Sequence, residues 1–260
     1  MGSALVAFSG GVDSSLLLKV ASQELPRDRL LAATACSETY PQSEIEDASA
    51  LAADLDVPHE LLTTSELGIE QFAANPPDRC YHCKQELFGK LLDVARRRGL
   101  EWVCDGSNHD DLGDWRPGMK AARELGVRSP LQEAGLTKTE IRALSRDMGL
   151  PTWDKPSFAC LASRFPYGQR ITPDELRRVD AAESSLRALG FKQVRVRHHG
   201  DVARIEVAAE DISRLLDPAL RDRIDARLRE LGYTYVAADL RGYRTGSMNE
   251  PLGEVGPDQP

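Results

Sequence analysis

The segment of residues 4–25 constrains the fold more than any other part of the chain. Its first five residues, Ala-Leu-Val-Ala-Phe, form a short apolar run that predicts a buried parallel strand. The run leads directly into Ser9-Gly10-Gly11-Val12-Asp13-Ser14, after which apolar residues recur at helical spacing as far as Leu25, and Pro26 follows. A strand, a glycine-containing loop and a helix in this order gather backbone N–H groups and the positive end of a helix dipole. We therefore expect an anion-binding turn at residues 9–14.

Strand and helix signals alternate over the first 150 residues. Further strands are predicted at 30–35, 60–64 and 102–104. One helix is expected to begin at Ser43, where Ser43 and Glu46 match a capping box, and another to run from 86 to 98. This alternation predicts an α/β fold with a doubly wound parallel sheet, whose binding sites lie at the carboxyl ends of its strands. We assign residues 1–150 to this domain.

The pattern changes between residues 151 and 170. Three prolines punctuate this stretch and helical periodicity is absent, which predicts a linker or an active-site loop. A helix should then begin at Thr172-Pro173-Asp174-Glu175, which combines an N-cap, a proline at the first helical position and a capping-box glutamate. Strand signals at 193–197, 203–207 and 234–238, with a helical region at 212–231, predict a second, smaller α/β domain over residues 171–250. Residues 251–260 are expected to form a flexible tail.

Composition narrows the class of protein. Of the 260 residues, 41% are hydrophobic and 28% are charged, as in ordinary soluble globular proteins. No apolar run is long enough to span a bilayer and no signal peptide is visible, so we expect a cytoplasmic protein without a membrane partner. The net charge of −8 argues against a nucleic-acid partner, which needs clustered Lys and Arg, although residues 195–204 do gather positive charge. The odd number of cysteines, five, argues against a disulfide framework and favours metal binding or catalysis for a clustered pair.

The loop at residues 9–14 offers the groups that bind a phosphate chain. Gly10 and Gly11 let the backbone approach an anion closely, Ser9 and Ser14 add hydroxyl donors, and Asp13 can hold Mg²⁺ on the phosphates. The loop lacks the Gly-Lys-Ser/Thr ending of a Walker A motif and does not match a G-x-G-x-x-G fingerprint. The alternative is a tight strand-to-helix turn in which a serine only caps the helix.

The sequence Ser-Gly-Gly-Val-Asp-Ser resembles the PP-loop motif of the ATP pyrophosphatase superfamily, whose members adenylate their substrates and release pyrophosphate. A second stretch, Asp-Gly-Ser-Asn-His-Asp-Asp at residues 105–111, resembles the G-[TS]-N-x-D-D segment that follows a later strand in that fold. The resemblance implies ATP and Mg²⁺ as cofactors. It also implies ATP contacts from Gly106, Asn108 and Asp111.

The cysteines separate into two groups. Cys36 and Cys104 fall in apolar strands, where a buried small side chain is the favoured interpretation. Cys80 and Cys83 form a C-x-x-C pair, and Cys160 lies in the proline-punctuated stretch. Three thiolates without a fourth suit a [4Fe–4S] cluster with one open iron, whereas structural zinc normally has all four positions closed by protein. Zinc at the three cysteines remains the alternative.

Five stretches together resemble the LarE family, the ATP-dependent sulfur transferases that help to make the nickel-pincer cofactor of lactate racemase. They cover residues 75–84, 116–121, 129–131, 151–170 and 194–200. The resemblance implies a pyridinium mononucleotide substrate with two carboxylates, each adenylated and then converted to a thiocarboxylate, in a homo-oligomeric enzyme. In single-cysteine members the cysteine that matches Cys160 gives up its own sulfur and becomes dehydroalanine. Cys80, Cys83 and Cys160 instead match members in which three cysteines hold a [4Fe–4S] cluster that carries an added sulfide, from a donor that the sequence does not identify.

Candidate substrate contacts come from the second half of the chain. Arg195 and Arg197 alternate along one predicted strand, so both point to the same face and can grip a phosphate; a solvated strand face is the alternative. Arg164, four residues after Cys160, is a candidate contact for phosphate or AMP, and the resemblance adds Glu183. His198 and His199 are expected at the surface, without an assigned role.

Two other functions fit parts of the pattern. A cluster-dependent tRNA thiolase of the PP-loop class would share the loop and the cysteines, but it should carry a basic surface, which the net charge of −8 does not support. A non-catalytic metal or nucleotide sensor would release no pyrophosphate, whereas Asp13 and Ser14 complete the adenylating loop.

Overall fold

A computed structural model describes residues 1–113, 117–156, 159–244 and 246–252. The chain forms two compact units: the first contains residues 1–72 and the described part of 77–156, and the second contains residues 73–76 and the described part of 159–252. Residue 116 of the stretch 116–121, residues 157 and 158 of the expected loop, and the expected tail from residue 253 onward lie outside the described residues.

The first unit is built on a parallel sheet of four strands. These are β1 (Ala4–Ala7), β2 (Leu30–Cys36), β3 (His59–Thr63) and β4 (Trp102–Cys104), in the order β3-β2-β1-β4. In the register, Leu5 of β1 lies opposite Leu31 of β2 and Val103 of β4. The predicted strands and the α/β class are therefore confirmed.

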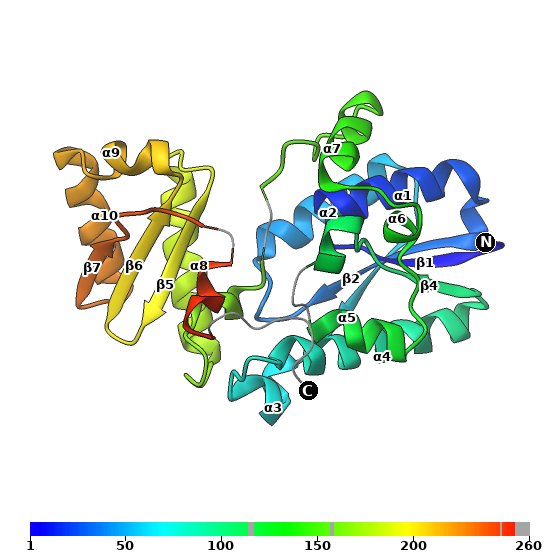
Figure 1. Ribbon diagram of the computed structural model, residues 1–260, viewed down its shortest axis with the longest axis horizontal. Coiled ribbons are helices and arrows are strands. Elements are labelled where there is room, and N and C mark those ends of the chain that lie inside the picture. Colours follow the sequence, from blue (N-terminus) through cyan, green and yellow to red (C-terminus); the bar gives the residue numbers. More distant parts are fainter. Residues whose placement is uncertain (114–116, 157–158, 245, 253–260) are drawn as a thin grey trace. The chain divides into compact units, whose positions relative to one another are not determined.

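Helices cover both faces of this sheet (Figure 1). One face packs against α1 (Val12–Glu24), α2 (Gln42–Asp54) and α7 (Lys138–Asp147), and the other against α4 (Arg79–Arg98) and α5 (Pro117–Glu124). Each face has its own apolar cluster, because alternate residues of β1 point in opposite directions: Val6 packs toward α1 and Leu5 toward α4. The short helices α3 (Glu70–Ala73) and α6 (Pro130–Glu133) lie in the connections. The predicted doubly wound arrangement is confirmed.

Two helix starts differ from the prediction. The helix expected at 86–98 begins at Arg79, so Cys80 and Cys83 lie in its first two turns. Its early residues carry few apolar side chains, which hid the helical period. The capping box expected at Ser43 does not form: α2 begins at Gln42, Pro41 occupies the N-cap position, and no side chain within the described residues caps it.

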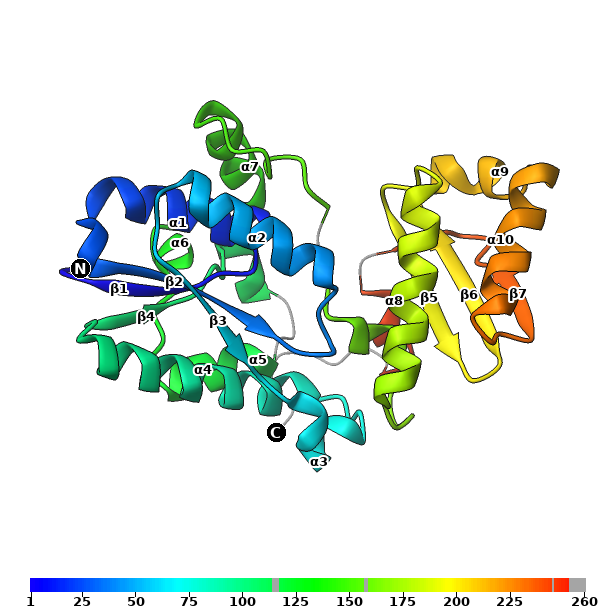
Figure 2. The ribbon, with the colours of Figure 1, turned by 180° about the vertical axis from the view of Figure 1, so that it is seen from behind.

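The second unit pairs one mixed sheet with helices on one face. Strands β5 (Val194–His199) and β6 (Val202–Val207) are antiparallel, and β7 (Tyr235–Ala238) adds parallel to β6. Helices α8 (Pro173–Ala188) and α10 (Pro218–Glu230) lie together in front of this sheet in Figure 2. Their apolar residues pack with those of β5 and β6 in a separate cluster.

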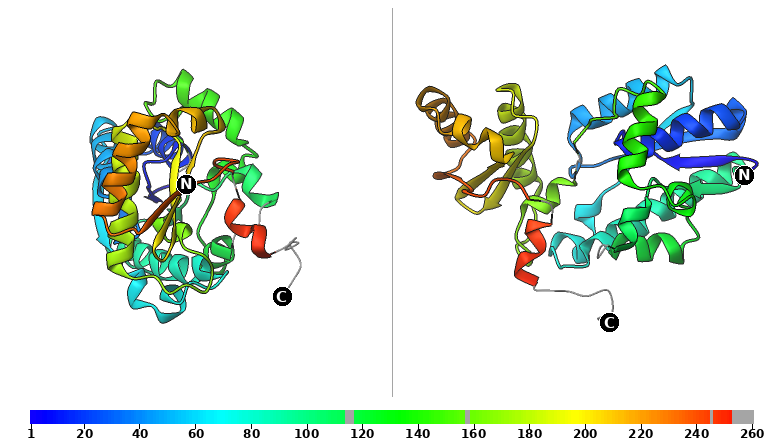
Figure 3. Two further views of the ribbon diagram at one scale, coloured as in Figure 1. Left: turned by 90° about the vertical axis from the view of Figure 1, so that its left-hand side faces the viewer. Right: turned by 45° about the horizontal axis from the view of Figure 1, so that its top comes forward.

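The helices of this unit agree closely with those predicted from the sequence. The capping box at Thr172 and Glu175 is confirmed. The helical region expected at 212–231 divides into α9 (Ile212–Leu215) and α10, because Asp217 caps a new start at Pro218. A short 3₁₀ helix, Ser247–Leu252, is drawn in red in Figure 3.

Residues 73–76 join the second unit although the first unit surrounds them in the sequence. Asn75 is fully buried with a φ of 56°, and its amide donates to the carbonyl oxygen of Pro166 at 2.7 Å. Backbone N–H groups of Gly168 and Ile171 donate to the carbonyl oxygens of Asn75 and Ala73 at 2.9 and 2.8 Å. Within the described parts of the chain, no helix is both long and apolar enough to cross a bilayer.

Candidate active site

The loop at residues 9–14 connects β1 to α1 at the carboxyl end of the central strand. Gly10 has a φ of 67°, and a Cβ atom there would lie 3.1 Å from the Cβ of Ala48 in α2. The hydroxyls of Ser9 and Ser14 lie 3.1 Å apart, and the Ser14 hydroxyl donates to the carbonyl oxygen of Gly11 at 3.2 Å. The loop is therefore tight, and both serines predicted to bind phosphate sit beside the start of α1.

The second predicted motif meets this loop from β4, the neighbour of β1 in the sheet. A Cβ atom on Gly106 would lie only 2.9 Å from the backbone nitrogen of Ser14, so the two backbones approach as closely as glycine permits. The amide of Asn108 donates to Oδ1 of Asp13 at 3.2 Å, and the N–H of Asn108 donates to Oδ2 of Asp111 at 2.9 Å. The structure thus brings together residues that lie almost 100 positions apart.

Lys138 is a residue at this site that the sequence reasoning missed. It is the first residue of α7, and its ammonium forms an ion pair with Oδ2 of Asp13. Neither predicted motif contains it, and its distance along the chain from Asp13 left no local signal in the sequence.

A small pocket of about 70 Å³ opens beside Ser9. The ends of β1 and β2 form one wall, and α2 and α4 supply the rest. Its lining residues are Ala7, Phe8, Ser9, Ala33, Thr34, Ala35, Tyr40, Glu44, Ile45, Lys84, Leu87 and Leu91. This pocket lies at the carboxyl ends of parallel strands, where the fold class places ligands.

Cys80 and Cys83 lie three residues apart in the first two turns of α4, so they share one face of the helix. Cys80 is exposed and Cys83 is buried. Cys160 belongs to the second unit and is half-buried at the start of the 3₁₀ turn Leu161–Arg164. Among the residues that the structure describes, no three His, Cys, Asp or Glu side chains are gathered as a metal site.

The two remaining cysteines lie in strands. Cys104 is buried in the core of the first unit, as predicted, and burial raises the pKa of its thiol to about 12. Cys36, at the end of β2, is half-buried, and burial raises the pKa of its thiol too. Raised thiol pKa values disfavour thiolate, which suits packing more than reactivity.

Arg164 and Glu183 form a fully buried, bidentate ion pair in the second unit. Nε and Nη2 of Arg164 lie 2.7 and 2.9 Å from the two oxygens of Glu183. Nη1 of Arg164 donates to the carbonyl oxygens of Ala159 and Cys160 at 2.7 and 3.2 Å. Burial raises the pKa of Glu183, but Arg164 and the nearby Arg195 and Arg187 outweigh it and leave that pKa below its usual value. Arg164 thus fixes the backbone at Cys160, and Glu183 holds Arg164 in place.

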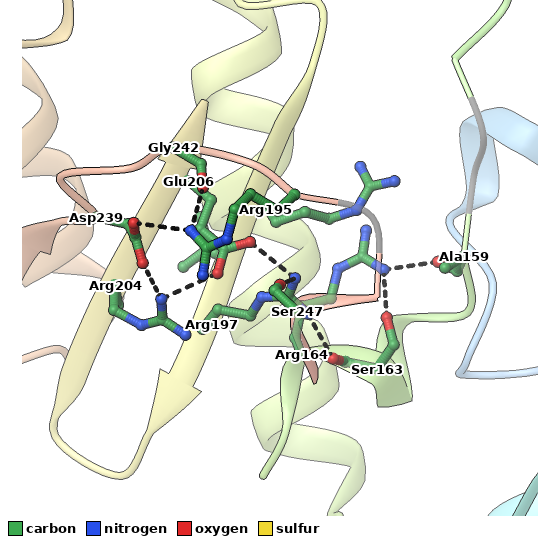
Figure 4. A network of polar contacts seen from close by, with 12 residues as sticks. Ala159, Ser163, Arg164, Arg195, Arg197, Arg204, Glu206, Asp239, Gly242 and Ser247 are labelled. Carbon is green, nitrogen blue, oxygen red and sulfur yellow. Dashed lines mark hydrogen bonds and ion pairs between the residues drawn. The ribbon is translucent and has the colours of Figure 1, made fainter. Parts of the chain in front are cut away.

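Arg195 and Arg197 lie on the sheet face opposite α8, as Figure 4 shows. Nη2 of Arg197 lies 2.7 Å from Glu206, and its Nη1 donates to the carbonyl oxygen of Ser163 at 2.8 Å. The guanidinium of Arg195 lies over the ring of Tyr243, and burial, together with the charge of Arg164, lowers its pKa to about 10. Both arginines are buried, so the alternative of a solvated strand face is wrong.

His198 is not the surface residue that was expected. It is 1% exposed and lies on the helix-facing side of β5, with ring nitrogens 3.2 Å from the Tyr233 hydroxyl and 3.3 Å from Glu175. Burial lowers its pKa, against the opposing effect of Glu175. The strand alternation that puts Arg195 and Arg197 on one face puts His198 on the other. His199 is exposed, as expected.

Comparisons with known proteins agree with this geometry. A family model described as asparagine synthase matches residues 3–96, which include the loop at 9–14. A pyridinium-3,5-bisthiocarboxylic acid mononucleotide synthase of Lactiplantibacillus plantarum is 43% identical over 95% of this chain and 89% of its own. An uncharacterised protein of Synechocystis is 45% identical over 96% and 92% of the two chains.

More distant similarity extends to other sulfur-inserting enzymes. A tRNA-specific 2-thiouridylase of Thermus thermophilus is 31% identical over 58% of this chain and 52% of its own. The motifs of the first unit, and the nearly full-length identity to the mononucleotide synthase, lead to one assignment. The chain belongs to the LarE family of ATP-dependent sulfur transferases, built on a PP-loop domain.

Proposed function

We propose that this enzyme adenylates the two carboxylates of a pyridinium-3,5-dicarboxylate mononucleotide and converts them to thiocarboxylates. The observation that carries the proposal is the meeting of the two ATP motifs: Gly106 packs against Ser14, and Asn108 binds Asp13. The substrate class is supported by the name of the Lactiplantibacillus plantarum relative.

In this proposal the first unit binds ATP. The phosphates lie at the start of α1, where the backbone of Gly10 and Gly11 and the hydroxyls of Ser9 and Ser14 can reach them. The adenosine lies in the pocket beside Ser9, whose polar lining includes Thr34. Gly106, Asn108 and Asp111 support the loop and the nucleotide from β4.

The residues around Asp13 fit a magnesium ion. The Asp13 carboxylate is partly exposed, and hard oxygen ligands of this kind, with phosphate oxygens, are what Mg²⁺ prefers. Bound there, the ion would neutralise charge on the phosphate chain. Asn108 orients the same carboxylate through its 3.2 Å hydrogen bond.

The chemistry follows from the poor reactivity of a carboxylate. A carboxylate oxygen of the substrate bonds to the α-phosphorus of ATP, the bond from that phosphorus to the pyrophosphate oxygen breaks, and pyrophosphate leaves. The acyl adenylate then has a good leaving group, AMP. A sulfur nucleophile bonds to the acyl carbon, and AMP departs with the electron pair of the broken C–O bond.

The arginine face of the second unit suits the phosphate of the mononucleotide. Four arginines, Arg195, Arg197, Arg204 and Arg244, face three carboxylates there, Glu206, Asp239 and Glu250, which leaves an excess of positive charge. Arg195 and Arg197 are the proposed direct contacts. Arg164 and Glu183 border the same site and hold the turn after Cys160.

We propose that Cys80, Cys83 and Cys160 hold a [4Fe–4S] cluster. The donor set fits, because two thiols lie on one face near the start of α4, Cys80 is exposed, and three cysteine ligands leave one iron open. Such a cluster supplies, when bound, a site for the sulfide that replaces AMP. With this donor, Cys160 would keep its own sulfur and the enzyme would turn over.

Anaerobic purification, iron and acid-labile sulfide analysis, and a visible spectrum test the cluster. We expect about four irons and four sulfides per chain, the content of one [4Fe–4S] cluster. One zinc without labile sulfide would refute it. In the enzyme assay, Cys160→Ala should abolish thiolation and still transfer AMP to the substrate, and the buried Cys104→Ala is the matched control. Loss of adenylation in Cys160→Ala alone would contradict the proposed division of labour.

A tRNA thiolase is the second candidate, because the Thermus thermophilus relative carries that name. The net charge of −8 argues against it, and we propose that the enzyme has no nucleic-acid partner. A gel-shift assay with total tRNA separates the two, since a thiolase would shift tRNA. We also propose that the enzyme is a homo-oligomer, and sedimentation of the protein without tRNA tests this.

A further inference from the structure

The segment that follows α7 is fixed to the first unit by two basic side chains. Leu150 is buried in the apolar cluster that includes α1, and residues 151–154 then form turns. The first of the two side chains belongs to Arg142 on α7. Its Nη1 and Nη2 donate to the carbonyl oxygens of Trp153 and Lys155 at 2.7 and 2.9 Å, so the backbone is held at both residues.

The second side chain, that of Lys155, holds the same segment to a different helix. Its ammonium lies 2.9 Å from Oε2 of Glu44 and 3.2 Å from Oδ2 of Asp47, both on α2. Because these carboxylates are three residues apart, they share one face of α2 and meet a single cation. The side chains of Lys155 and Glu44 are each 18% exposed, so water and salt screen this pair less than an ion pair at the open surface.

Glu44 also lines the pocket beside Ser9, which holds the adenosine of ATP in the proposed function. This pocket wall and Lys155 belong to the first unit. Cys160 follows Lys155 by five residues, which is at most about 18 Å of fully extended chain. The anchor at Lys155 therefore limits the reach of a cysteine that the sulfur chemistry uses.

We propose that Lys155 is a positioning residue of the sulfur-transfer step. Its ion pair with Glu44 ties the chain that carries Cys160 to the wall of the adenosine pocket. In this step sulfur bonds to the acyl carbon, and AMP leaves with the electron pair of the broken C–O bond. The inference rests on the proposed function, because adenylation must first supply the acyl adenylate. Adenosine carries no charge, so removing the ammonium should affect the capture of sulfur more than the binding of ATP.

The test compares Lys155→Met with Lys90→Met. Methionine keeps a long side chain and removes the charge. Lys90 is a matched control in the first unit, because its ammonium pairs with Glu86 at 2.7 Å and donates to the carbonyl oxygen of Thr63 at 3.0 Å. Exchange of labelled pyrophosphate into ATP, in the presence of the pyridinium dicarboxylate mononucleotide, measures adenylation. Mass spectrometry measures the thiocarboxylate formed per AMP released.

Lys155→Met should leave the pyrophosphate exchange rate and the KM for ATP unchanged. The acyl adenylate that sulfur does not capture is lost to water, which releases AMP without product. Thiocarboxylate per AMP should therefore fall about 10- to 100-fold, as expected when a reacting group is misplaced. Lys90→Met should change none of these quantities, and Lys155→Arg should keep the wild-type yield.

Hydrogen exchange followed by mass spectrometry tests the anchor without the reaction. The N–H of Lys155 donates to the carbonyl oxygen of Thr152 at 3.0 Å. Lys155→Met should speed exchange in residues 151–156 and leave exchange in α7 as it is. Arg142→Met removes the other anchor and should lower the thiocarboxylate yield in the same way, so it carries the test if Lys155→Met does not fold.

The outcomes separate the two proposals. Equal losses of pyrophosphate exchange and thiocarboxylate yield would mean that Lys155 only stabilises the fold, and would overturn its role in positioning. A raised KM for ATP with an unchanged yield would overturn it as well, because the ammonium would then serve only the nucleotide pocket. Unchanged hydrogen exchange in residues 151–156 would refute the anchor. A wild type that exchanges no pyrophosphate would overturn the proposed adenylation itself, whatever the hydrogen exchange shows.

Discussion

Single glycines set how closely the two ATP motifs can approach. Gly106→Ala would place a Cβ atom 2.9 Å from the backbone nitrogen of Ser14, where neither backbone can yield without moving α1 or β4. We expect a loss of about 1–3 kcal/mol in the free energy of unfolding, the usual cost of overpacking. We also expect the affinity for an uncleavable ATP analogue to fall at least tenfold.

Urea unfolding and calorimetric titration measure both effects. Gly89→Ala is the control, because a Cβ atom there meets nothing within 4 Å and the residue lies inside α4. Alanine should stabilise that helix by about 0.5–1 kcal/mol. Wild-type analogue affinity in Gly106→Ala would show that the close approach does not shape the site.

At this scale the sequence predicts what is local and misses what is distant. The loop at 9–14 and Asn108 were predicted because each carries its own motif after its own strand. Lys138 was missed because its partner lies 125 residues away and a lysine in a helix normally faces solvent. His198 was misjudged because its burial depends on Tyr233 and Glu175 packing over β5.

At the scale of elements, two predicted capping boxes have similar sequence patterns, but only the one at Thr172 forms. At Thr172 the hydroxyl accepts from the N–H of Glu175, whereas Ser43 lies inside α2, which already begins at Gln42. Thr172→Ala should therefore lower the free energy of unfolding by about 0.5–2 kcal/mol. Ser43→Ala should stay within about 0.5 kcal/mol of the wild type. Urea unfolding measures both, and equal losses would mean that the sequence pattern, not the formed cap, sets the stability.

Strand positions were predicted well because buried parallel strands form continuous apolar runs bounded by turns. The start of α4 was not, since the residues from Arg79 to Lys84 carry polar groups and two cysteines that show no apolar period. Helical period reappears only with Leu87 and Leu91, which pack on the sheet. The first turns of α4 instead lie against α5, where a Cβ atom on Gly118 would be 2.9 Å from Cγ of Lys84. The helix therefore begins seven residues before its apolar period does.

At the scale of the molecule, the second unit includes residues 73–76, which come from the first half of the chain. Asn75→Ala loses the 2.7 Å hydrogen bond to Pro166 and puts alanine at a φ of 56°. These losses should destabilise the second unit by about 2–4 kcal/mol, combining a buried hydrogen bond with a left-handed backbone. Asn75→Gly keeps the backbone freedom and should lose less.

Two probes distinguish the units in this experiment. No tryptophan falls in the ranges assigned to the second unit, and Trp102 and Trp153 lie in the first, so tryptophan fluorescence does not follow unfolding of the second unit. Far-ultraviolet circular dichroism follows both. Asn75→Ala should move part of the dichroism transition to lower urea and leave the fluorescence transition in place. A shift of the fluorescence transition alone would contradict the assignment of residues 73–76.

Residues 73–76 are synthesised well before the residues that they bind in the second unit. They leave the ribosome about 90 residues before Pro166, which at about 5–20 residues per second is a delay of roughly 5–20 s. During that time the first unit acquires its last core side chains, such as Leu150, while Asn75 waits for its partner. The waiting segment, Ala-Ala-Asn-Pro, holds none of the β-branched or aromatic residues that favour strand pairing, so it offers little to neighbouring nascent chains.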